Sequence, residues 1–166
     1  MLPRSALLAL ARASFEEREG RLDEARAAFE TLLSAEDVLP SHFIARMRLG
    51  WRAGGAVEGR AVFARARRHA CCSWEVYAAA AHLEGTLGAA PDAAAATPLA
   101  AVEPAASART GLTISHSKVA RRIYVLALER FPTVLSLRLE YARWLRSSGE
   151  TVALRVHLEA SLERIR

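Results

Sequence analysis

Histidine is the side chain with which this sequence could most readily perform acid–base or metal chemistry, and the chain has five of them. Each stands alone, and none has a second ligand at the spacing of an H-E-x-x-H motif. The sequence also lacks a phosphate-binding P-loop, a G-x-G-x-x-G motif and a G-x-S-x-G nucleophile motif. We therefore expect no enzyme, no catalytic or metal-binding residues and no cofactor. Surface or partly buried positions are expected for His42, His69, His82, His116 and His157.

The two cysteines, Cys71 and Cys72, are neighbours in the chain. A structural metal site needs separated pairs of ligands, and a disulfide framework needs several cysteines in a secreted chain. Neither pattern is present, so we expect two buried or partly buried thiols in a reducing, intracellular compartment.

The composition is typical of one folded domain with a sizeable core. The chain has 166 residues, of which 52% are hydrophobic. No window reaches the ~18 uninterrupted apolar residues of a membrane span. The opening "MLPRSALLALARASFEE" has arginines within its apolar run and acidic residues directly after it, which favours a helix over a signal peptide. We expect a single domain over residues 1–166 and no membrane partner.

The formal net charge of +5 would suit an RNA or an acidic protein as partner. The densest basic cluster is "RARRHA", in which Arg65, Arg67 and Arg68 could contact phosphate or a partner's carboxylates. The cluster has no interleaved aromatic residues of the kind that stack on bases. A solvated helix end is the alternative, because cations are favoured at the C-terminus of a helix.

A repeated spacing is the strongest pattern in the sequence. The run "GRLDEARAAF" places Arg26 and then Phe29 after Gly20. The run "GGAVEGRAVF" places Arg60 and Phe63 after Gly54 with the same spacing. A fixed period of this length indicates stacked supersecondary units.

The pattern is interrupted once and then resumes. In this register the arginine after Arg60 is Arg121, almost twice as far along the chain as Arg60 is from Arg26, so a segment has been inserted. The original interval then returns between Arg121 and Arg155. The insertion, residues 89–114, contains three prolines and many alanines, and we expect it to form a flexible excursion.

Apolar residues recur with helical spacing on both sides of each glycine, so each unit is predicted to be a helix, a turn and an antiparallel helix. The predicted units cover residues 3–35, 40–70, 73–131 and 133–166. Such pairs bury their apolar faces only by stacking on one another. The sequence therefore predicts an all-α fold, a right-handed α–α superhelix of about four helical hairpins.

Four kinds of residue are expected to hold the hairpins together. Glycines close the turns, bulky side chains fill the grooves between units, and small residues allow helices to approach closely. The repeated arginines could pair with a carboxylate on a neighbouring helix, such as Glu16 or Glu84, or they could be solvated. The predicted packing residues are Phe15, Gly20, Ala25, Arg26, Phe29, Leu49, Gly54, Arg60, Phe63, Leu83, Gly88, Arg121, Tyr124, Trp144, Gly149, Arg155 and Leu158.

The order of these features resembles the HAT (half-a-TPR) repeat. In "FEEREGRLDEARAAFETLL" an aromatic residue and glutamates precede the glycine, and "AR" and a second aromatic residue follow it. The longer run from Phe29 to Arg68 is similar to the C-terminal HAT half of the large scaffold subunit of cleavage stimulation factor, in the Suf family. The link "LLSAEDVLP" and the run "RAGGAVEGRAVFARAR" carry this second resemblance.

The resemblance implies a protein-interaction scaffold of messenger-RNA 3′-end processing, located in the nucleus. It also implies homodimerisation, protein partners among the subunits of that machinery, and an indirect association with RNA. Two alternatives keep the fold and change the function. One is a TPR-like module that binds a short peptide in its concave groove, and the other is a HAT protein of splicing or ribosomal-RNA processing.

Overall fold

The computed structural model describes residues 6–86 and 106–163. This part of the chain folds into helices and contains no β-strand. The helices are α1 (Ala6–Arg18), α2 (Leu22–Leu33), α3 (Pro40–Ala66), α4 (Trp74–Thr86), α5 (Ala106–Arg130), α6 (Leu135–Ser147) and α7 (Thr151–Glu163).

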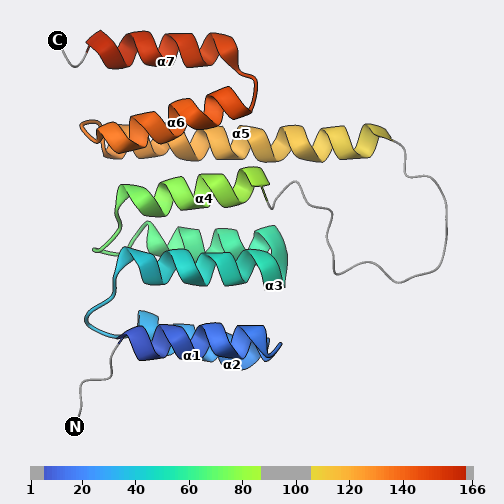
Figure 1. Cartoon of the computed structure of the whole chain (residues 1–166), viewed down its shortest axis with the longest axis vertical. Coiled ribbons are helices and arrows are strands. Elements are labelled where there is room, and N and C mark those ends of the chain that lie inside the picture. Colours follow the sequence, from blue (N-terminus) through green and yellow to red (C-terminus); the bar gives the residue numbers. More distant parts are fainter. Residues whose placement is uncertain (1–5, 87–105, 164–166) are drawn as a thin grey trace.

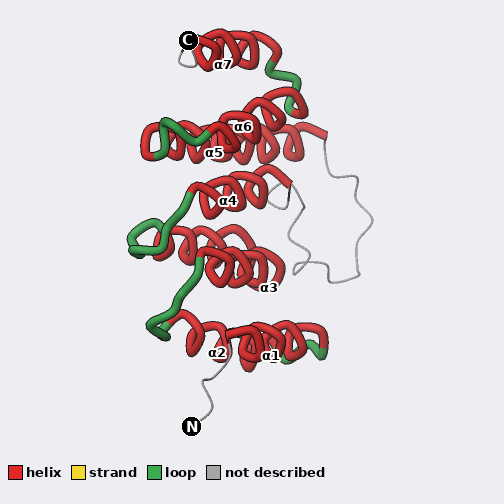
Figure 2. Tube along the Cα trace, turned by 60° about the vertical axis from the view of Figure 1, so that its left-hand side comes forward, coloured by secondary structure: helices red, strands yellow, loops and turns green. Residues whose placement is uncertain are grey.

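The helices lie across the long axis of the molecule and follow one another in chain order (Figure 1). The pair α1 and α2 forms one end of the stack and α7 the other, and each helix packs against its neighbours in the chain. The contact between α4 and α6 joins the third pair to the fourth. The expected all-α solenoid of stacked helical pairs is confirmed (Figure 2).

Two of the turns between paired helices are closed by a glycine in the left-handed conformation. Gly20 has a φ of 76°, its N–H donates to the carbonyl of Glu17, and the N–H of Arg21 donates to the carbonyl of Glu16. Gly149 (φ 73°) and the residue after it form the same two hydrogen bonds to the last turn of α6. This is the Schellman arrangement, which satisfies the last carbonyls of the first helix while the chain reverses.

The second pair differs by one residue from the sequence expectation. Its two helices are the two parts of α3, and the residue with left-handed φ between them is Gly55 (φ 69°, ψ −163°), not Gly54. A Cβ atom on Gly54 would overlap a carboxylate oxygen of Glu58. Gly54 is therefore required for the close approach of the Glu58 side chain, and Gly55 makes the reversal.

The third pair contains the insertion, and part of that segment is helical. Helix α5 begins at Ala106, so residues 106–114 extend the helix and do not belong to an irregular excursion. The last proline of the segment is Pro104, and from Ala106 onward nothing in the sequence prevents a helix. Residues 87–105, with the predicted turn residue Gly88, lie outside the described residues.

Buried apolar side chains form two clusters along the stack. The smaller cluster joins α1, α2 and the first part of α3 around Phe29 and Leu49. The larger cluster runs from Leu33 at the end of α2 to Leu145 of α6 and includes Trp51, which lies over Gly59. A Cβ atom on Gly59 would overlap the Trp51 ring. The two parts of α3 can therefore pack this closely only because residue 59 has no side chain.

Candidate functional site

The junctions between successive pairs are built from an aromatic side chain on the second helix of one pair and the first helix of the next pair. Phe29 shares a buried cluster with Leu49. The Phe63 ring meets the Tyr77 ring edge-on, at 5.3 Å between centroids, and Tyr124 lies 5.2 Å from Tyr141. The repeated ring therefore contacts the next unit at each of the three junctions.

Burial of this repeat position changes at α7. Phe29, Phe63 and Tyr124 are 2%, 8% and 3% exposed, whereas Leu158 at the same register is 43% exposed. Burial also raises the pKa of Tyr124 to about 12, because its ionised form would be poorly solvated. Leu158 is exposed because no further described helix packs on α7 beyond α6.

The repeated arginines connect the same units. Arg26 binds Glu58 through two nitrogen atoms, at 3.1 and 2.9 Å. Arg60 binds Glu84 in the same two-point manner, and Arg121 binds Glu150 at 3.0 Å. Each of these arginines lies in the second helix of a pair and reaches a carboxylate of the following pair. Arg26 and Arg60 do so in a bidentate arrangement, and Arg121 through one nitrogen atom.

Arg155 occupies the same register on α7, but its contact is local. Its Nε atom donates to Glu159, one turn further along the same helix, at 2.9 Å. Both side chains are largely exposed. An exposed pair of this kind contributes little to stability, so the Arg155 guanidinium is available for a stronger contact.

The carboxylate partners of the arginines lie in different environments. Glu84 is 1% exposed and also contacts Nδ1 of His116 at 2.9 Å. Glu58 receives a second cation, because Nη1 of the buried Arg46 lies 2.8 Å from it. Hydrogen bonding by Arg26 is the main reason that the pKa of Glu58 is lowered, while its carboxylate in turn raises the pKa of Arg26.

Sequence reasoning named Glu84 as a possible partner but missed Glu58, Glu150 and Arg46. The partners do not share a register: Glu58 lies in a second helix, Glu84 in a first helix and Glu150 in a turn. Glu16, also suggested, binds Arg21 within the first unit at 2.5 Å. The repeat period locates the arginines and carries no signal for their partners.

The remaining packing residues fall into three groups. Ala25, Leu49, Leu83 and Ala120 are buried. Trp144 is partly buried beside Tyr124 and Tyr141. Phe15 is 55% exposed with the Arg21 guanidinium 5.5 Å from its ring, because no described helical pair precedes α1 and covers this side of it.

The three arginines of the basic cluster have different local contacts. Arg65 binds Glu30 of the first pair, and the Arg67 guanidinium lies 5.8 Å from the Phe63 ring. Arg130 of α5 donates to the carbonyl of Arg67 at 2.9 Å. Arg67 and Arg68 both have exposed side chains and form no ion pair with another described residue, whereas Arg65 does.

Histidine and cysteine side chains have local contacts. Nδ1 of His69 lies 3.0 Å from Sγ of Cys71, and burial raises the pKa of both cysteine thiols. His157 contacts the Arg138 carbonyl at 3.0 Å, and desolvation lowers its pKa. Within the described ranges, no group of three histidine, cysteine or acidic side chains has a metal-binding arrangement, and no helix has the length and apolar character to cross a membrane.

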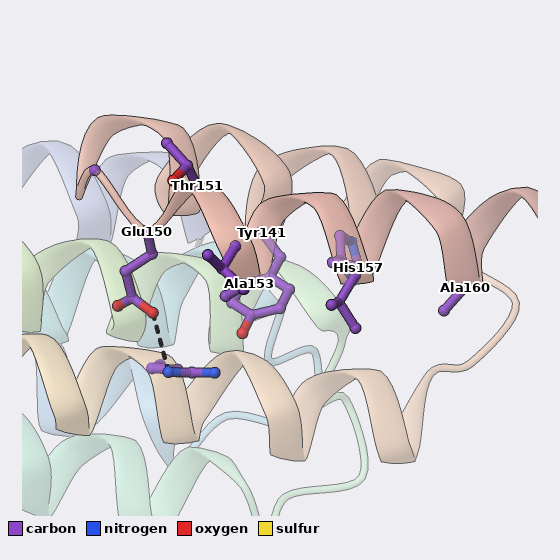
Figure 3. Close-up of a pocket in the computed structure, with 10 residues that line it drawn as sticks. Tyr141, Glu150, Thr151, Ala153, His157 and Ala160 are labelled. Atoms are coloured by element: carbon purple, nitrogen blue, oxygen red, sulfur yellow. Dashed lines mark hydrogen bonds and ion pairs between the residues drawn. The ribbon is translucent and has the colours of Figure 1, made fainter.

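A groove lies between α5 and α7, with a volume of about 690 Å³. It is lined by Arg121 of α5, Tyr141 of α6 and residues 149–160 of the α6–α7 turn and α7 (Figure 3). Glu150 lies at one end, bound to Arg121, and Ala160 lies at the other. We call this hollow the α5–α7 groove.

Helical pairs that stack in order, the first three with a ring and an arginine that contact the next pair, define a helical-repeat protein. The family model of the suppressor of forked protein (Suf) matches residues 1–97, and the chain belongs to this family. Suf is a HAT-repeat family of helical scaffolds related to messenger-RNA 3′-end processing, so the expected family is confirmed. No curated protein matches the chain.

The match covers the first two helical pairs and α4. Helices α5, α6 and α7 lie beyond it, yet Arg121 and Tyr124 make the contacts that Arg60 and Phe63 make one unit earlier. The repeat architecture therefore continues past the matched residues.

Proposed function

We propose that this chain is a protein–protein interaction scaffold of messenger-RNA 3′-end cleavage and polyadenylation. It acts in the nucleus through its stacked helical surfaces, and it self-associates. The membership in the Suf family supports the process and the nuclear location. The structure supports a binding role, because it offers broad helical faces and an unfilled repeat position.

The observation that carries this proposal is the outer face of α7. Leu158 has the register of the buried rings Phe29 and Phe63, and Arg155 has the register of arginines that clamp the next unit. Leu162 on the same helix is 62% exposed, whereas Leu33 at the equivalent position is buried. We call Arg155, Leu158 and Leu162 the α7 end face.

The end face carries the same kinds of residue as one side of the inner junctions. A helical surface that presents an apolar groove and a carboxylate would bury Leu158 and Leu162 and bind Arg155, as happens at the three junctions within the chain. Leu158 and Leu162 are 43% and 62% exposed, so covering the rest of both side chains contributes about 1.5–3 kcal/mol before the cost of association. A second copy of the chain is the partner that self-association requires.

Sedimentation velocity over a concentration series tests the self-association. We expect the unaltered chain to shift to a larger species as the concentration rises, and the Leu158→Asp variant to stay monomeric. Val57→Asp is the matched control, because Val57 is also an exposed apolar residue on a second helix and lies far from α7. A monomer at every concentration would remove self-association from the proposal.

The scaffold role is tested with purified subunits of the 3′-end processing machinery. We expect the folded chain to bind at least one of them and the Leu158→Asp variant to bind with unchanged or reduced affinity. Failure of every subunit to bind would contradict the scaffold role, whatever the oligomeric state.

Direct RNA binding is the rival function, and Arg65, Arg67 and Arg68 are the residues that would carry it. We expect their combined replacement by alanine to change the affinity for single-stranded RNA little at either of two salt concentrations. Because Arg65 also binds Glu30, the single Arg68→Ala variant serves as a control that leaves the unit junction intact. A large, salt-dependent loss of RNA affinity in both variants would favour the rival.

A further inference from the structure

The α5–α7 groove is hollow because the second helices of the third and fourth pairs are held apart. Tyr141 of α6 forms the floor and is itself buried. A second hollow, of about 640 Å³, runs along α5 from Lys118 to Glu129, and Arg121 borders both. The two hollows therefore adjoin at Arg121 and make up a surface that spans α5 and α7.

Valine side chains give this surface an apolar stripe. Val152 and Val156 of α7 line the groove and are 78% and 61% exposed. Val125 lines the hollow on α5 and is also exposed. At the register of Val156 the first two units have Ala27 and Ala61, so the apolar stripe is widest on α7.

Cations gather at one end of the same surface. Lys118 and Arg122 are exposed and lie one turn apart on α5. Neither forms an ion pair with another described side chain, whereas their neighbour Arg121 is held by Glu150. The N-terminus of α7 begins beside Arg121 at Thr151, and its dipole adds to the positive potential.

We propose that the α5–α7 groove and the adjoining hollow on α5 together bind an acidic amphipathic segment of a partner protein. Carboxylates of the segment contact Lys118 and Arg122, and its apolar side chains cover Val152 and Val156. The inference deepens the proposed scaffold function by assigning a surface and a partner chemistry, and it rests on that function only in taking a protein as partner. It concerns a different face of α7 from the end face.

A protein segment fits the groove better than a nucleic acid does. Nucleic-acid grooves combine cations with exposed aromatic rings on which bases stack. The ring in this groove belongs to Tyr141, which is 6% exposed and already packed against His157 at 4.8 Å. Exposed valines instead favour the apolar side chains of an amphipathic peptide.

Binding of two synthetic probe peptides to the full chain tests the proposal. The first peptide is helix-forming, with leucines on one face and glutamates beside them, and the second has glutamine in place of every glutamate. We expect the acidic peptide to bind ~10-fold more tightly or better, and this difference to shrink as the ionic strength rises. Equal binding of the two peptides, or no binding of either, would overturn the proposal.

Variants locate the site. We expect the double variant Lys118→Glu, Arg122→Glu to weaken binding of the acidic peptide ~10-fold or more, and Val152→Asp to weaken it comparably. Val57→Asp and Arg48→Glu are the matched controls. Val57 has the same place after Gly54 as Val152 has after Gly149, and Arg48 is an exposed cation of the second unit.

A loss of affinity in the controls equal to that in the groove variants would overturn the location. Competition by a single-stranded homopolymeric RNA that is relieved by Lys118→Glu, Arg122→Glu would assign the groove to nucleic acid instead. Circular dichroism of each variant establishes that the helices are intact before binding is compared.

Lys118 offers a second, independent measurement, because it is the sole lysine of the chain. A carbodiimide joins a carboxylate to an amine without a spacer, so the acidic peptide should be crosslinked to Lys118 and mapped there by mass spectrometry. Absence of this crosslink for a bound peptide would overturn the proposal. If the chain binds a processing subunit but not the acidic peptide, the groove proposal alone is contradicted. If it binds the acidic peptide but no subunit, the scaffold role alone is contradicted.

Discussion

The inner junctions and the outer face of α7 use the same repeat positions with opposite results. In the inner junctions the ring of one pair is buried against the next pair, and the arginine binds a carboxylate of that pair, as with Phe63 and Arg60. On α7 the corresponding Leu158 and Arg155 are exposed, and the arginine turns back to its own helix. The comparison shows that each second helix presents the same two repeat positions. Whether the side chain at the ring position is buried or exposed depends on whether another pair packs against it.

The largest difference in unfolding free energy between the two regions is expected at the repeated bulky residue, which is buried in the inner junctions and exposed on α7. We expect Phe29→Ala to reduce the free energy of unfolding by about 3–5 kcal/mol, because it leaves a cavity between two units. Leu158→Ala should cost about 1 kcal/mol or less, since the side chain is already partly in water. Urea unfolding followed by circular dichroism measures both, and equal losses would break the comparison.

The repeated arginines should show a smaller difference in unfolding free energy between an inner junction and α7. Arg60→Ala deprives the buried Glu84 of its main partner and should cost about 1.5–3 kcal/mol. Arg155→Ala should lie within about 0.5 kcal/mol of the unaltered chain, because its ion pair is exposed. The same unfolding measurement applies, and a large loss for Arg155→Ala would show that its local pair is structural.

The contact between Trp51 and Gly59 predicts a net loss of stability of up to about 2 kcal/mol when Gly59 is replaced by alanine. Gly59→Ala gains helix propensity of about 1 kcal/mol but forces the Trp51 ring to move, which costs about 1–3 kcal/mol. We expect net destabilisation, and relief of it when Trp51→Leu is combined with Gly59→Ala. A thermal melt of the single and double variants checks this, and a stabilised single variant would contradict it.

The smallest expected effect is a dependence on pH. The pKa of Glu58 in the folded chain is below its ordinary value of 4.5, mainly because Arg26 donates a hydrogen bond to it. Its contribution to stability is therefore fully present above the ordinary pKa and is lost as the pH falls through the lower, folded-state pKa. We expect the difference in unfolding free energy between the unaltered chain and Glu58→Gln to shrink over that acidic range.

Glu159→Gln is the control for the pH measurement, because Glu159 is an exposed partner of an exposed arginine. A difference between the unaltered chain and Glu58→Gln that stays constant through the acidic range would contradict the assigned role of the Arg26 pair.

Much of the fold could be predicted from the sequence, because the repeat period and the helical apolar spacing are properties of the chain itself. The turns at Gly20 and Gly149 follow from the same pattern. The shift from Gly54 to Gly55 could not be predicted, since it depends on the position of the Glu58 side chain.

The candidate site could be predicted only in part. The arginines are periodic, but their carboxylate partners come from different elements and are brought together by packing. The exposure of Phe15 and Leu158 depends on the absence of a neighbouring described pair, which no local spacing encodes. The α5–α7 groove exists because of the distance between α5 and α7. This distance cannot be predicted from the repeat pattern of the sequence.

The constancy of the arginine and the variability of its partner have a consequence for how such chains assemble. The arginine at this position binds a carboxylate of a first helix, a second helix or a turn. This contact therefore does not distinguish one hairpin from another. The order of the hairpins must therefore come from chain connectivity and from the fit of the rings, as where Phe63 meets Tyr77. If the hairpins were exchanged in the chain, we expect the arginine–carboxylate ion pairs between hairpins to form again. The aromatic side chains would no longer fit the neighbouring hairpin.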